Sequence, residues 1–227
     1  MRGLIVAIDG PAGSGKSSVA RTVAECLGLV NLNTGATYRA VALVALRDEI
    51  SLDDAAALAS VGELVDLAAD GVFYKGEPIA DDALRSPAVA AASSRVSAHP
   101  RLREILVERQ RLAAESAPGG AIVEGRDIGT VVLPAADLKV FLSASPEERA
   151  RRRAHQTGRE DELDRIREAI DTRDRRDSER EASPLMPAPD AVVLDTTELS
   201  LEEVVSRVVE LAHKRGATAG GWASGTV

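Results

Sequence analysis

Short apolar runs alternate along the chain with longer segments whose apolar residues recur at helical spacing. The short runs are mostly aliphatic and end at polar or glycine residues, which is typical of strands buried on both faces of a parallel sheet. They cover residues 4–8, 29–32, 121–123, 138–142 and 191–194. Helical spacing covers residues 17–27, 36–46, 100–116, 147–155, 163–180 and 201–212. The alternation predicts an α/β fold in which helices flank a central five-stranded parallel sheet, with 4–8 as the central strand.

Residues 51–97 break this alternation. A short helix pattern comes first, and two strand-like runs follow it at 64–69 and 72–74, each ended by a tight turn, Asp70-Gly71 or Lys75-Gly76. Residues 86–96 are rich in alanine and predict a helix. We expect an insertion with its own small sheet at about 51–97. It interrupts a single domain whose core covers 1–50, 98–155 and 181–215.

Two polar segments show no periodicity. Residues 156–162 have the composition of a mobile loop, and we expect a lid at about 156–163. From Gly216 onward alanine, glycine, serine and threonine dominate, which predicts a disordered tail at about 216–227.

The composition is that of a globular protein. Hydrophobic residues make up 44% of the 227 residues, and no apolar run approaches the roughly 18 residues of a membrane span. The net charge of −8 argues against general affinity for nucleic acid polymers. A single cysteine, Cys26, excludes an internal disulfide, and its helical spacing to Val19 and Val23 predicts a buried apolar role. The first strand follows the N-terminus without a basic region or cleavage site, so we expect a cytoplasmic protein without a membrane partner.

The first predicted strand leads into a phosphate-binding motif. The run Gly10-Pro11-Ala12-Gly13-Ser14-Gly15-Lys16-Ser17 fits G-x-x-x-x-G-K-[ST] between a strand pattern and a helix pattern. Its glycines allow backbone N–H groups to surround phosphate oxygens, Lys16 supplies a positive charge and Ser17 can ligate Mg²⁺. A glycine-rich turn without function does not explain the agreement of all eight positions. The expected ATP-binding residues are Gly10, Pro11, Ala12, Gly13, Ser14, Gly15, Lys16, Ser17 and Ser18.

Further polar groups follow other strands. Asn33-Thr34-Gly35 is followed by Arg39, and Glu124-Gly125-Arg126-Asp127 ends the run at 121–123. Arg173, Arg176, Asp177 and Arg180 differ by three or four positions and share one helix face. In isolation these patterns suit a capped helix and a solvated, salt-bridged helix. Beside a P-loop, arginines concentrated between Arg95 and Arg180 indicate a site for a polyphosphate ligand.

With these motifs in place, the chain resembles the bacterial cytidylate kinases, a family of nucleoside monophosphate kinases, over nearly its whole length. The residues that carry the resemblance are GPAGSGKSS (Gly10 to Ser18), NTGATYR (Asn33 to Arg39), ASSRVSAHPRLR (Ala92 to Arg103), EGRDIGTVVLP (Glu124 to Pro134) and RDRRDSEREASPL (Arg173 to Leu185). The inserted segment also matches this family and distinguishes it from short adenylate kinases. The resemblance implies a P-loop kinase fold, an inserted monophosphate-binding subdomain and a lid.

The resemblance also implies roles for individual residues. The monophosphate site would comprise Thr34, Arg39, Ser94, Arg103, Arg126, Asp127, Asp177 and Arg180. Within that set, Arg39, Arg103 and Arg126 match positions that hold the acceptor phosphate, and Ser94, Arg103 and Asp127 match positions near the cytosine. Asp177 and Arg180 match positions that reach the sugar or stabilise the closed state. The expected catalytic residues are Lys16, Arg126, Arg173 and Arg180.

Two positions depart from the family pattern. Thr34 replaces the usual serine but keeps its hydroxyl, and Glu124 replaces the usual aspartate but keeps a carboxylate for a water on Mg²⁺. Ser17 and Glu124 are therefore the expected metal residues. The implied substrates are ATP with CMP or dCMP, and the implied oligomeric state is a monomer.

P-loops also occur in two other functional classes. A GTPase-type switch needs an N-K-x-D motif, but Asn31 and Asn33 are the only asparagines and neither precedes lysine. A P-loop kinase for another small acceptor, UMP or a metabolite such as shikimate or gluconate, stays open. The insertion and the Arg173 to Arg180 face argue against a non-nucleotide acceptor.

Overall fold

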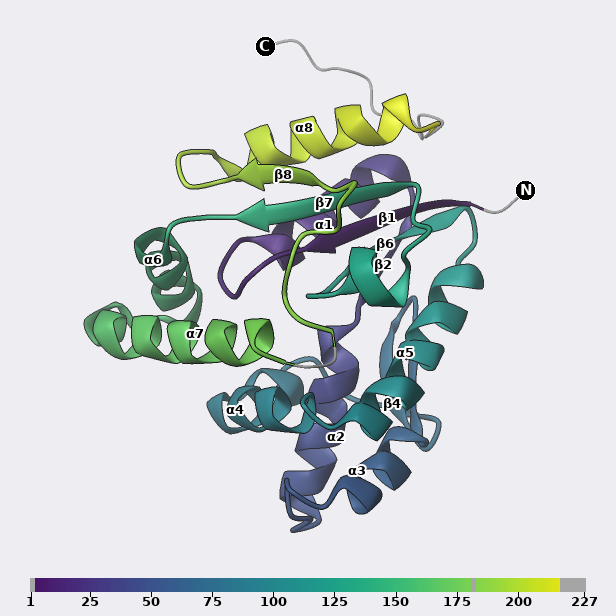
Figure 1. The fold of residues 1–227 in the computed structure, drawn as a ribbon, viewed down its shortest axis with the longest axis vertical. Helices are drawn as coiled ribbons and strands as arrows, with labels where there is room; N and C mark the ends of the chain where they lie inside the picture. Colours follow the sequence, from purple (N-terminus) through teal and green to yellow (C-terminus); the bar gives the residue numbers. More distant parts are fainter. Residues whose placement is uncertain (1–2, 181–182, 217–227) are drawn as a thin grey trace.

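A parallel sheet lies at the centre of the protein, whose computed structural model describes residues 3–180 and 183–216 (Figure 1). Within these residues, five parallel strands pair in the order β2-β6-β1-β7-β8, so the prediction that residues 4–8 form the central strand is confirmed. The strands are β1 (Leu4–Asp9), β2 (Val30–Asn33), β6 (Gly120–Glu124), β7 (Leu138–Ser143) and β8 (Val192–Asp195). The predicted α/β fold is confirmed.

Alternate residues of β1 pack on opposite faces of the sheet. Val6 and Ile8 belong to the core that includes α1 and α8, whereas Ile5 and Ala7 pack with α5. Side chains of a strand alternate between its faces, so a strand covered by helices on both faces must be apolar throughout. The helices are α1 (Lys16–Leu27), α2 (Gly35–Arg47), α5 (Pro100–Glu115), α6 (Pro146–Thr157), α7 (Leu163–Ser178) and α8 (Leu201–Lys214). Cys26 is partly buried against the α1–α8 core.

The predicted insertion has its own sheet and shares a hydrophobic core with α2 and α5. It contains α3 (Ala55–Gly62), β3 (Val65–Ala68), β4 (Gly71–Tyr74), β5 (Glu77–Pro78), the 3-10 turn η1 (Ala83–Arg85) and α4 (Pro87–Val96). The strands pair antiparallel in the order β3-β4-β5. Buried side chains of the insertion, among them Leu58, Val72 and Val89, pack with α2 and α5. This second core therefore joins the insertion to the main domain.

The segment predicted as a mobile loop is mostly helical. α6 continues through Thr157, Gly158 ends it with a φ of 62°, and the 3-10 turn η3 (Glu160–Glu162) leads directly into α7. The loop prediction was wrong because local polar contacts order the turn: Arg159 Nη2 donates to Glu162 Oε2 at 2.6 Å. α6 and α7 pack through Ala150, Ala154, Ile166 and Ile170.

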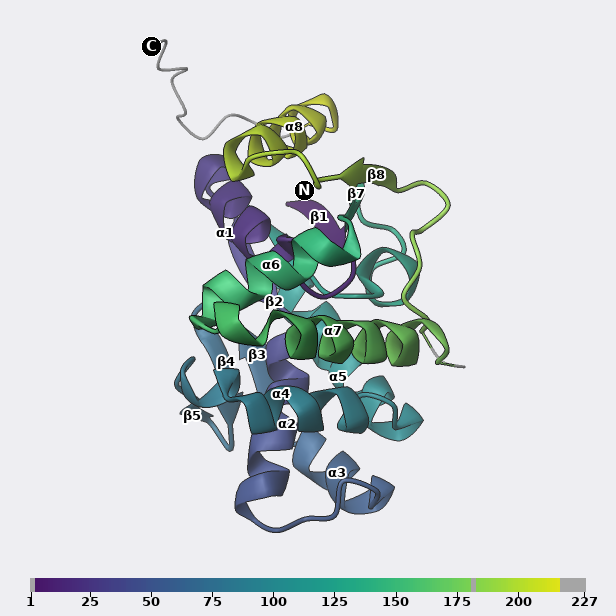
Figure 2. The same ribbon diagram turned by 90° about the vertical axis from the view of Figure 1, so that its left-hand side faces the viewer.

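The position of α7 brings distant segments together. It lies between α6 and α4 in two perpendicular views (Figures 1 and 2), and it contacts both helices. α7 ends at Ser178, so the helix predicted to reach Arg180 is two residues shorter. Residues 181–182, and residues 217–227 of the predicted tail, lie outside the described residues.

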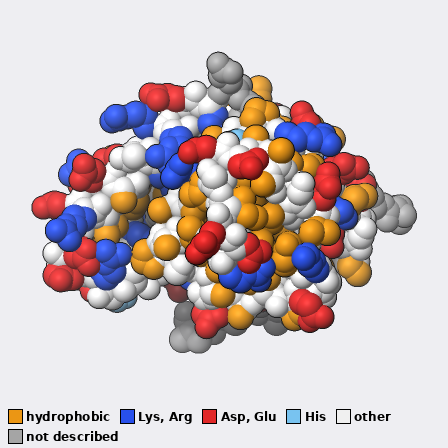
Figure 3. Space-filling view, turned by 90° about the horizontal axis from the view of Figure 1, so that it is seen from below, with side chains coloured by type: hydrophobic (Ala, Val, Ile, Leu, Met, Phe, Trp, Pro, Cys, Tyr) orange, Lys and Arg blue, Asp and Glu red, His pale blue; other side chains and the backbone are white. Residues whose placement is uncertain are grey.

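The outer surface carries mixed charge. Viewed from the end at which α3 lies, hydrophobic side chains gather near the middle of the surface, and charged side chains of both signs surround them (Figure 3). In the described part of the chain, no helix combines the length and the hydropathy that crossing a membrane requires.

Candidate active site

The predicted phosphate loop connects β1 to α1. Gly10 has a φ of 147° and Gly13 a φ of 75°, a region that favours glycine. A Cβ at Gly10 would lie 2.1 Å from the Leu142 carbonyl oxygen, and one at Gly13 would lie 2.6 Å from the Arg149 carbonyl oxygen. The loop therefore needs both glycines for its conformation and for its packing against β7 and α6. It leads into the N-terminus of α1, where free N–H groups and the helix dipole favour an anion.

Lys16 is folded over this loop. Its Nζ donates to the Pro11 carbonyl oxygen at 2.6 Å and lies 3.5 Å from Ser14 Oγ. Burial lowers the pKa of Lys16 to about 7, and the positive charge of Arg126 acts in the same direction. A bound phosphate would reverse this effect because it favours the charged ammonium.

The predicted metal residues lie together although 107 positions separate them. Ser17 Oγ donates to Glu124 Oε2 at 2.7 Å, and β1 and β6 are neighbours in the sheet, with Ile8 paired to Glu124. Burial raises the pKa of Glu124, while the Ser17 hydrogen bond and Lys16 oppose the rise. Among the described residues, no cluster of three or more His, Cys, Asp or Glu could hold a metal. One hydroxyl and one carboxylate fit Mg²⁺, which binds through few protein oxygens together with water and phosphate.

Thr34 and Arg39 lie beside this pair. Thr34 precedes α2, and its Oγ1 donates to the Glu124 carbonyl oxygen at 2.7 Å, because Asn33 of β2 pairs with Glu124 of β6. Arg39 Nη2 donates to Asn33 Oδ1 at 3.3 Å. Arg39 Nε is buried and makes no hydrogen bond within the described part of the chain.

Arg103 and Asp127 form a buried ion pair. Arg103 of α5 donates from Nη2 to Asp127 Oδ2 at 2.5 Å, with the two side chains 5% and 8% exposed. Arg103 also donates from Nη1 to the Ser97 carbonyl oxygen at 3.3 Å, and its guanidinium lies 5.4 Å from the centre of the Tyr38 ring. Packing and hydrogen bonds thus fix the orientation of the Arg103 and Asp127 side chains.

Three arginines lie around Asp177, which is near the end of α7. Arg126 Nε lies 3.4 Å from Asp177 Oδ2, Arg173 Nε lies 3.8 Å from the same oxygen, and Arg180 Nη2 lies 3.7 Å from Oδ1. Arg173 Nε, Arg180 Nη2 and Asp177 Oδ2 are buried but make no hydrogen bond to any described residue. Burial lowers the pKa of Arg173 to about 10, and Arg126 adds to the effect. Buried donors at ion-pair distance from one carboxylate are suited to an anionic ligand that supplies the missing acceptors.

The insertion reaches this cluster through Ser94. Arg176 of α7 donates from Nη1 to Ser94 Oγ at 2.8 Å, and Ser94 is buried on α4. The structure therefore brings together the predicted residues of the P-loop, the strand ends, the insertion and α7.

Comparison with known proteins identifies the family. Residues 6–214 match a family model described as cytidylate kinase. The chain belongs to the cytidylate kinase family. It is 45% identical over 222 residues to a cytidylate kinase of Desulfitobacterium hafniense (strain Y51), covering 94% of each chain. It is 46% identical to a cytidylate kinase of Geobacillus kaustophilus (strain HTA426), covering 94% of this chain and 98% of the relative.

A solved structure supports the fold alone. An uncharacterized protein from Eubacterium ventriosum has a TM-score of 0.51 at 12% identity, covering 92% of this chain and 98% of that protein. The resemblance to cytidylate kinases that the sequence indicates is confirmed.

Three residues of this cytidylate kinase family member were not predicted as site residues. Asp9 accepts the N–H groups of Ile128 and Gly129 at 2.8 and 2.7 Å, which fastens the segment after Asp127 to the start of the P-loop. Burial raises the pKa of Asp9 to about 6. The position of Asp9 directly before Gly10 is a signal in the sequence, but the strand pattern marks Asp9 only as the end of a strand.

Asp174 and Arg149 are the other two. Asp174 accepts the Ala12 N–H at 3.0 Å, and Arg149 Nη1 donates to the Ala12 carbonyl oxygen at 3.1 Å. Both residues stand in charge-rich helices, where sequence spacing does not distinguish a site residue from a solvated one.

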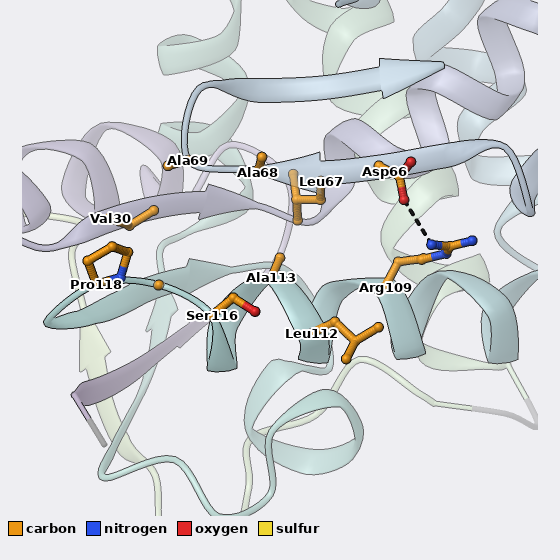
Figure 4. A pocket seen from close by; sticks show the side chains of 11 residues that line it. Val30, Asp66, Leu67, Ala68, Ala69, Arg109, Leu112, Ala113, Ser116 and Pro118 are labelled. Carbon is orange, nitrogen blue, oxygen red and sulfur yellow. Dashed lines mark hydrogen bonds and ion pairs between the residues drawn. The ribbon is translucent and has the colours of Figure 1, made fainter. Parts of the chain in front are cut away.

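A separate pocket lies between β3 and α5 (Figure 4). Its charged groups, Asp66 and Arg109, pair with each other at 3.0 Å. None of the predicted site residues lines it. Its lining comprises Val30, Asp66, Leu67, Ala68, Ala69, Arg109, Leu112, Ala113, Ser116, Ala117 and Pro118.

Proposed function

We propose that the chain transfers the γ-phosphoryl group of ATP to CMP or dCMP, giving ADP and CDP or dCDP. The observation that carries the proposal is the position of Arg126. Its Nη1 donates to the Gly10 carbonyl oxygen at 3.0 Å, and its Nε lies 3.4 Å from Asp177 on α7. One guanidinium thus lies between the phosphate loop and the cluster of buried arginines, where it would contact a phosphoryl group in transfer.

The P-loop supports ATP as the phosphoryl donor. Residues Gly10 to Ser18 place backbone N–H groups at the start of α1, and Lys16 would release the Pro11 carbonyl to contact the β- and γ-phosphates. Ser17 and Glu124 would hold Mg²⁺, Ser17 through its hydroxyl and Glu124 through a water. The ion would supply further neutralisation of the phosphate charge.

Transfer between two phosphates depends on positioning and charge neutralisation. The acceptor phosphate is already an anion near neutral pH, so no general base is required. Arg39, Arg103 and Arg126 would hold it. Lys16, Arg126, Arg173 and Arg180 would neutralise charge on the group in transfer.

The buried pair of Arg103 and Asp127 supports a cytosine acceptor. Cytosine offers an amine as donor and a ring nitrogen as acceptor, so a carboxylate and a guanidinium complement it. Ser94 lies on the insertion and would complete the base site. Asp177 and Arg180 would reach the sugar or stabilise the closed state, and Thr34 would help to shape the phosphate site.

Lid closure would exclude water from the phosphates. Because residues 156–163 are mostly helical, the moving unit that we propose is the α6–η3–α7 hairpin, which presents Arg173 to the site. Closure would limit hydrolysis of ATP by water.

We further propose that the chain acts as a monomer in the cytoplasm, with neither a membrane nor a nucleic acid polymer as partner. The net charge of −8 supports the last point, and the single cysteine is compatible with a reducing compartment.

The test is an assay of ADP release over CMP, dCMP, UMP, AMP, shikimate and gluconate. We expect strong turnover with CMP and dCMP, weak turnover with UMP and almost none with the others. A kcat/KM for UMP or for a metabolite that is higher than the values for CMP and dCMP would refute the proposed acceptor.

A further inference from the structure

Asp174 of α7 lies at the P-loop and accepts from three donors. Its Oδ1 accepts the Ala12 N–H at 3.0 Å and Arg126 Nη1 at 3.3 Å, and its Oδ2 accepts Arg149 Nη1. Arg126 and Arg149 are also hydrogen bonded to the loop backbone, at the carbonyl oxygens of Gly10 and Ala12. The Asp174 side chain is 15% exposed. One carboxylate thus connects α7 to both arginines and to the loop.

The donors around Asp174 are of the kind that binds a phosphoryl oxygen. A P-loop N–H and guanidinium groups are the donors that commonly hold phosphate oxygens. Asp171, one turn earlier on α7, has no such surroundings: its side chain is 44% exposed and lies 4.0 Å from Arg167. Asp177, one turn later, is also near arginines, but Asp174 is distinguished by accepting the P-loop N–H of Ala12 as well.

Like charges repel strongly where water is largely excluded. The carboxylate of Asp174 and the triphosphate of ATP would both be negative, and both would use donors at the P-loop. They cannot use the same donors together.

We propose that Asp174 is a positioning residue that holds Arg126, Arg149 and α7 at the P-loop before ATP binds and is displaced by the ATP phosphates. This inference rests on the proposed use of the P-loop as the ATP site. Displacement transfers the two arginines from a carboxylate to a phosphate and couples ATP binding to movement of α7. The carboxylate opposes ATP binding, but before ATP arrives it keeps the two arginines beside the site that the phosphates will occupy.

A purely structural role for Asp174 would not change ATP affinity and kcat in opposite directions, so measuring both quantities tests the proposal. Asp174→Asn keeps the shape and removes the charge, so the Kd for ATP without CMP, measured by titration calorimetry, should fall about tenfold, within the usual range of coupling between sites. With CMP present, kcat should fall because ADP is then also held more tightly and leaves more slowly. Asp171→Asn is the matched control and should leave both quantities unchanged.

An unchanged or weaker ATP affinity in a folded Asp174→Asn protein overturns the inference. The ATP measurement needs no acceptor, so it stands even if CMP proves not to be the substrate.

A second measurement leaves Asp174 intact and covers the case in which its variant fails to fold. Spin labels are attached to cysteines at the exposed positions Arg21 of α1 and Arg175 of α7, with Cys26 replaced by alanine. ATP alone should change the distance distribution between the labels. An unchanged distribution would show that α7 does not move when ATP binds and would overturn the inference.

Discussion

Ser17 Oγ, at the start of α1, donates to Oε2 of Glu124, the last residue of β6, at 2.7 Å, and the P-loop joins α1 to β1, the neighbour of β6 in the sheet. The pair exists because parallel strands bring their ends to the same edge of a sheet, where open α/β folds bind ligands. Glu124 is 4% exposed, and burial raises its pKa. A buried carboxylate that needs a cation nearby is suited to the Mg²⁺ of a nucleotide.

Glu124→Gln should reduce kcat by about a hundredfold and raise the Mg²⁺ concentration needed for half-maximal rate. The amide keeps the size of the side chain and can still accept from Ser17, so the melting temperature should not fall by more than a few degrees. Steady-state rates over a Mg²⁺ titration and a thermal melt check both points. Wild-type Mg²⁺ dependence would remove Glu124 from the metal site.

Lys16→Ala should abolish transfer, with a loss of at least about a hundredfold in kcat, while the fold stays intact. Burial disfavours the charged ammonium, so its removal should not lower the melting temperature of the ligand-free protein. Lys214→Ala, at the exposed end of α8, is the control. A folded Lys16→Ala protein with near-normal turnover would contradict the assignment of the P-loop.

Arg126→Lys should lose about ten- to a hundredfold in kcat/KM for CMP although the charge is kept, because an ammonium cannot reproduce the two directions in which the guanidinium contacts Gly10 and Asp177. Arg101→Lys changes an exposed ion pair and serves as the control. Arg39→Lys should behave like Arg126→Lys. Wild-type kcat/KM in the Arg126 variant would make Arg126 a structural residue.

The local parts of the fold could be predicted from the sequence, whereas the contacts between elements could not. The strand at 4–8 and the motif after it are contiguous, so periodicity and motif spacing are sufficient to identify them. The Ser17–Glu124 pair depends on β1 and β6 being neighbours, which no local pattern records. Asp174 was overlooked because the spacing argument followed the basic face of α7, and its partners Ala12 and Arg149 become neighbours only when α7 packs against the P-loop. The 3-10 turn η3 was missed because its order comes from polar contacts such as Arg159–Glu162 rather than from apolar residues.

Asp9 should make stability depend on pH between about 4 and 6. The unfolded chain releases its proton near pH 3.8, but burial raises the pKa of Asp9 to about 6 in the folded protein. The folded state therefore holds an extra proton in this window, and the contribution of Asp9 is present below pH 3.8 and is lost as pH rises through about 6. The free energy of unfolding should lose up to about 3 kcal/mol from this source.

Asp9→Asn removes this titration. The difference in unfolding free energy, wild type minus variant, should decrease from about pH 4 to about pH 7 and stay constant above that, as measured by urea unfolding at each pH. The exposed Asp164 provides the comparison through Asp164→Asn. A difference that does not vary with pH would mean that the pKa of Asp9 is not raised.

Asp127→Asn tests the choice of base. Asp127 accepts from Arg103 in a buried pair, and a carboxylate beside a guanidinium suits the donor amine and acceptor nitrogen of cytosine but opposes uracil, whose pattern is reversed. A mismatched buried polar group costs about 1 to 3 kcal/mol. The ratio of kcat/KM for CMP to that for UMP should therefore fall by about tenfold or more in the variant, whereas Asp53→Asn, at an exposed ion pair of the insertion, should leave it unchanged. An equal loss for the two substrates would mean that Asp127 shapes the phosphate site by holding Arg103 in place, and recognition of the base would then rest on the insertion, beginning with Ser94 on α4.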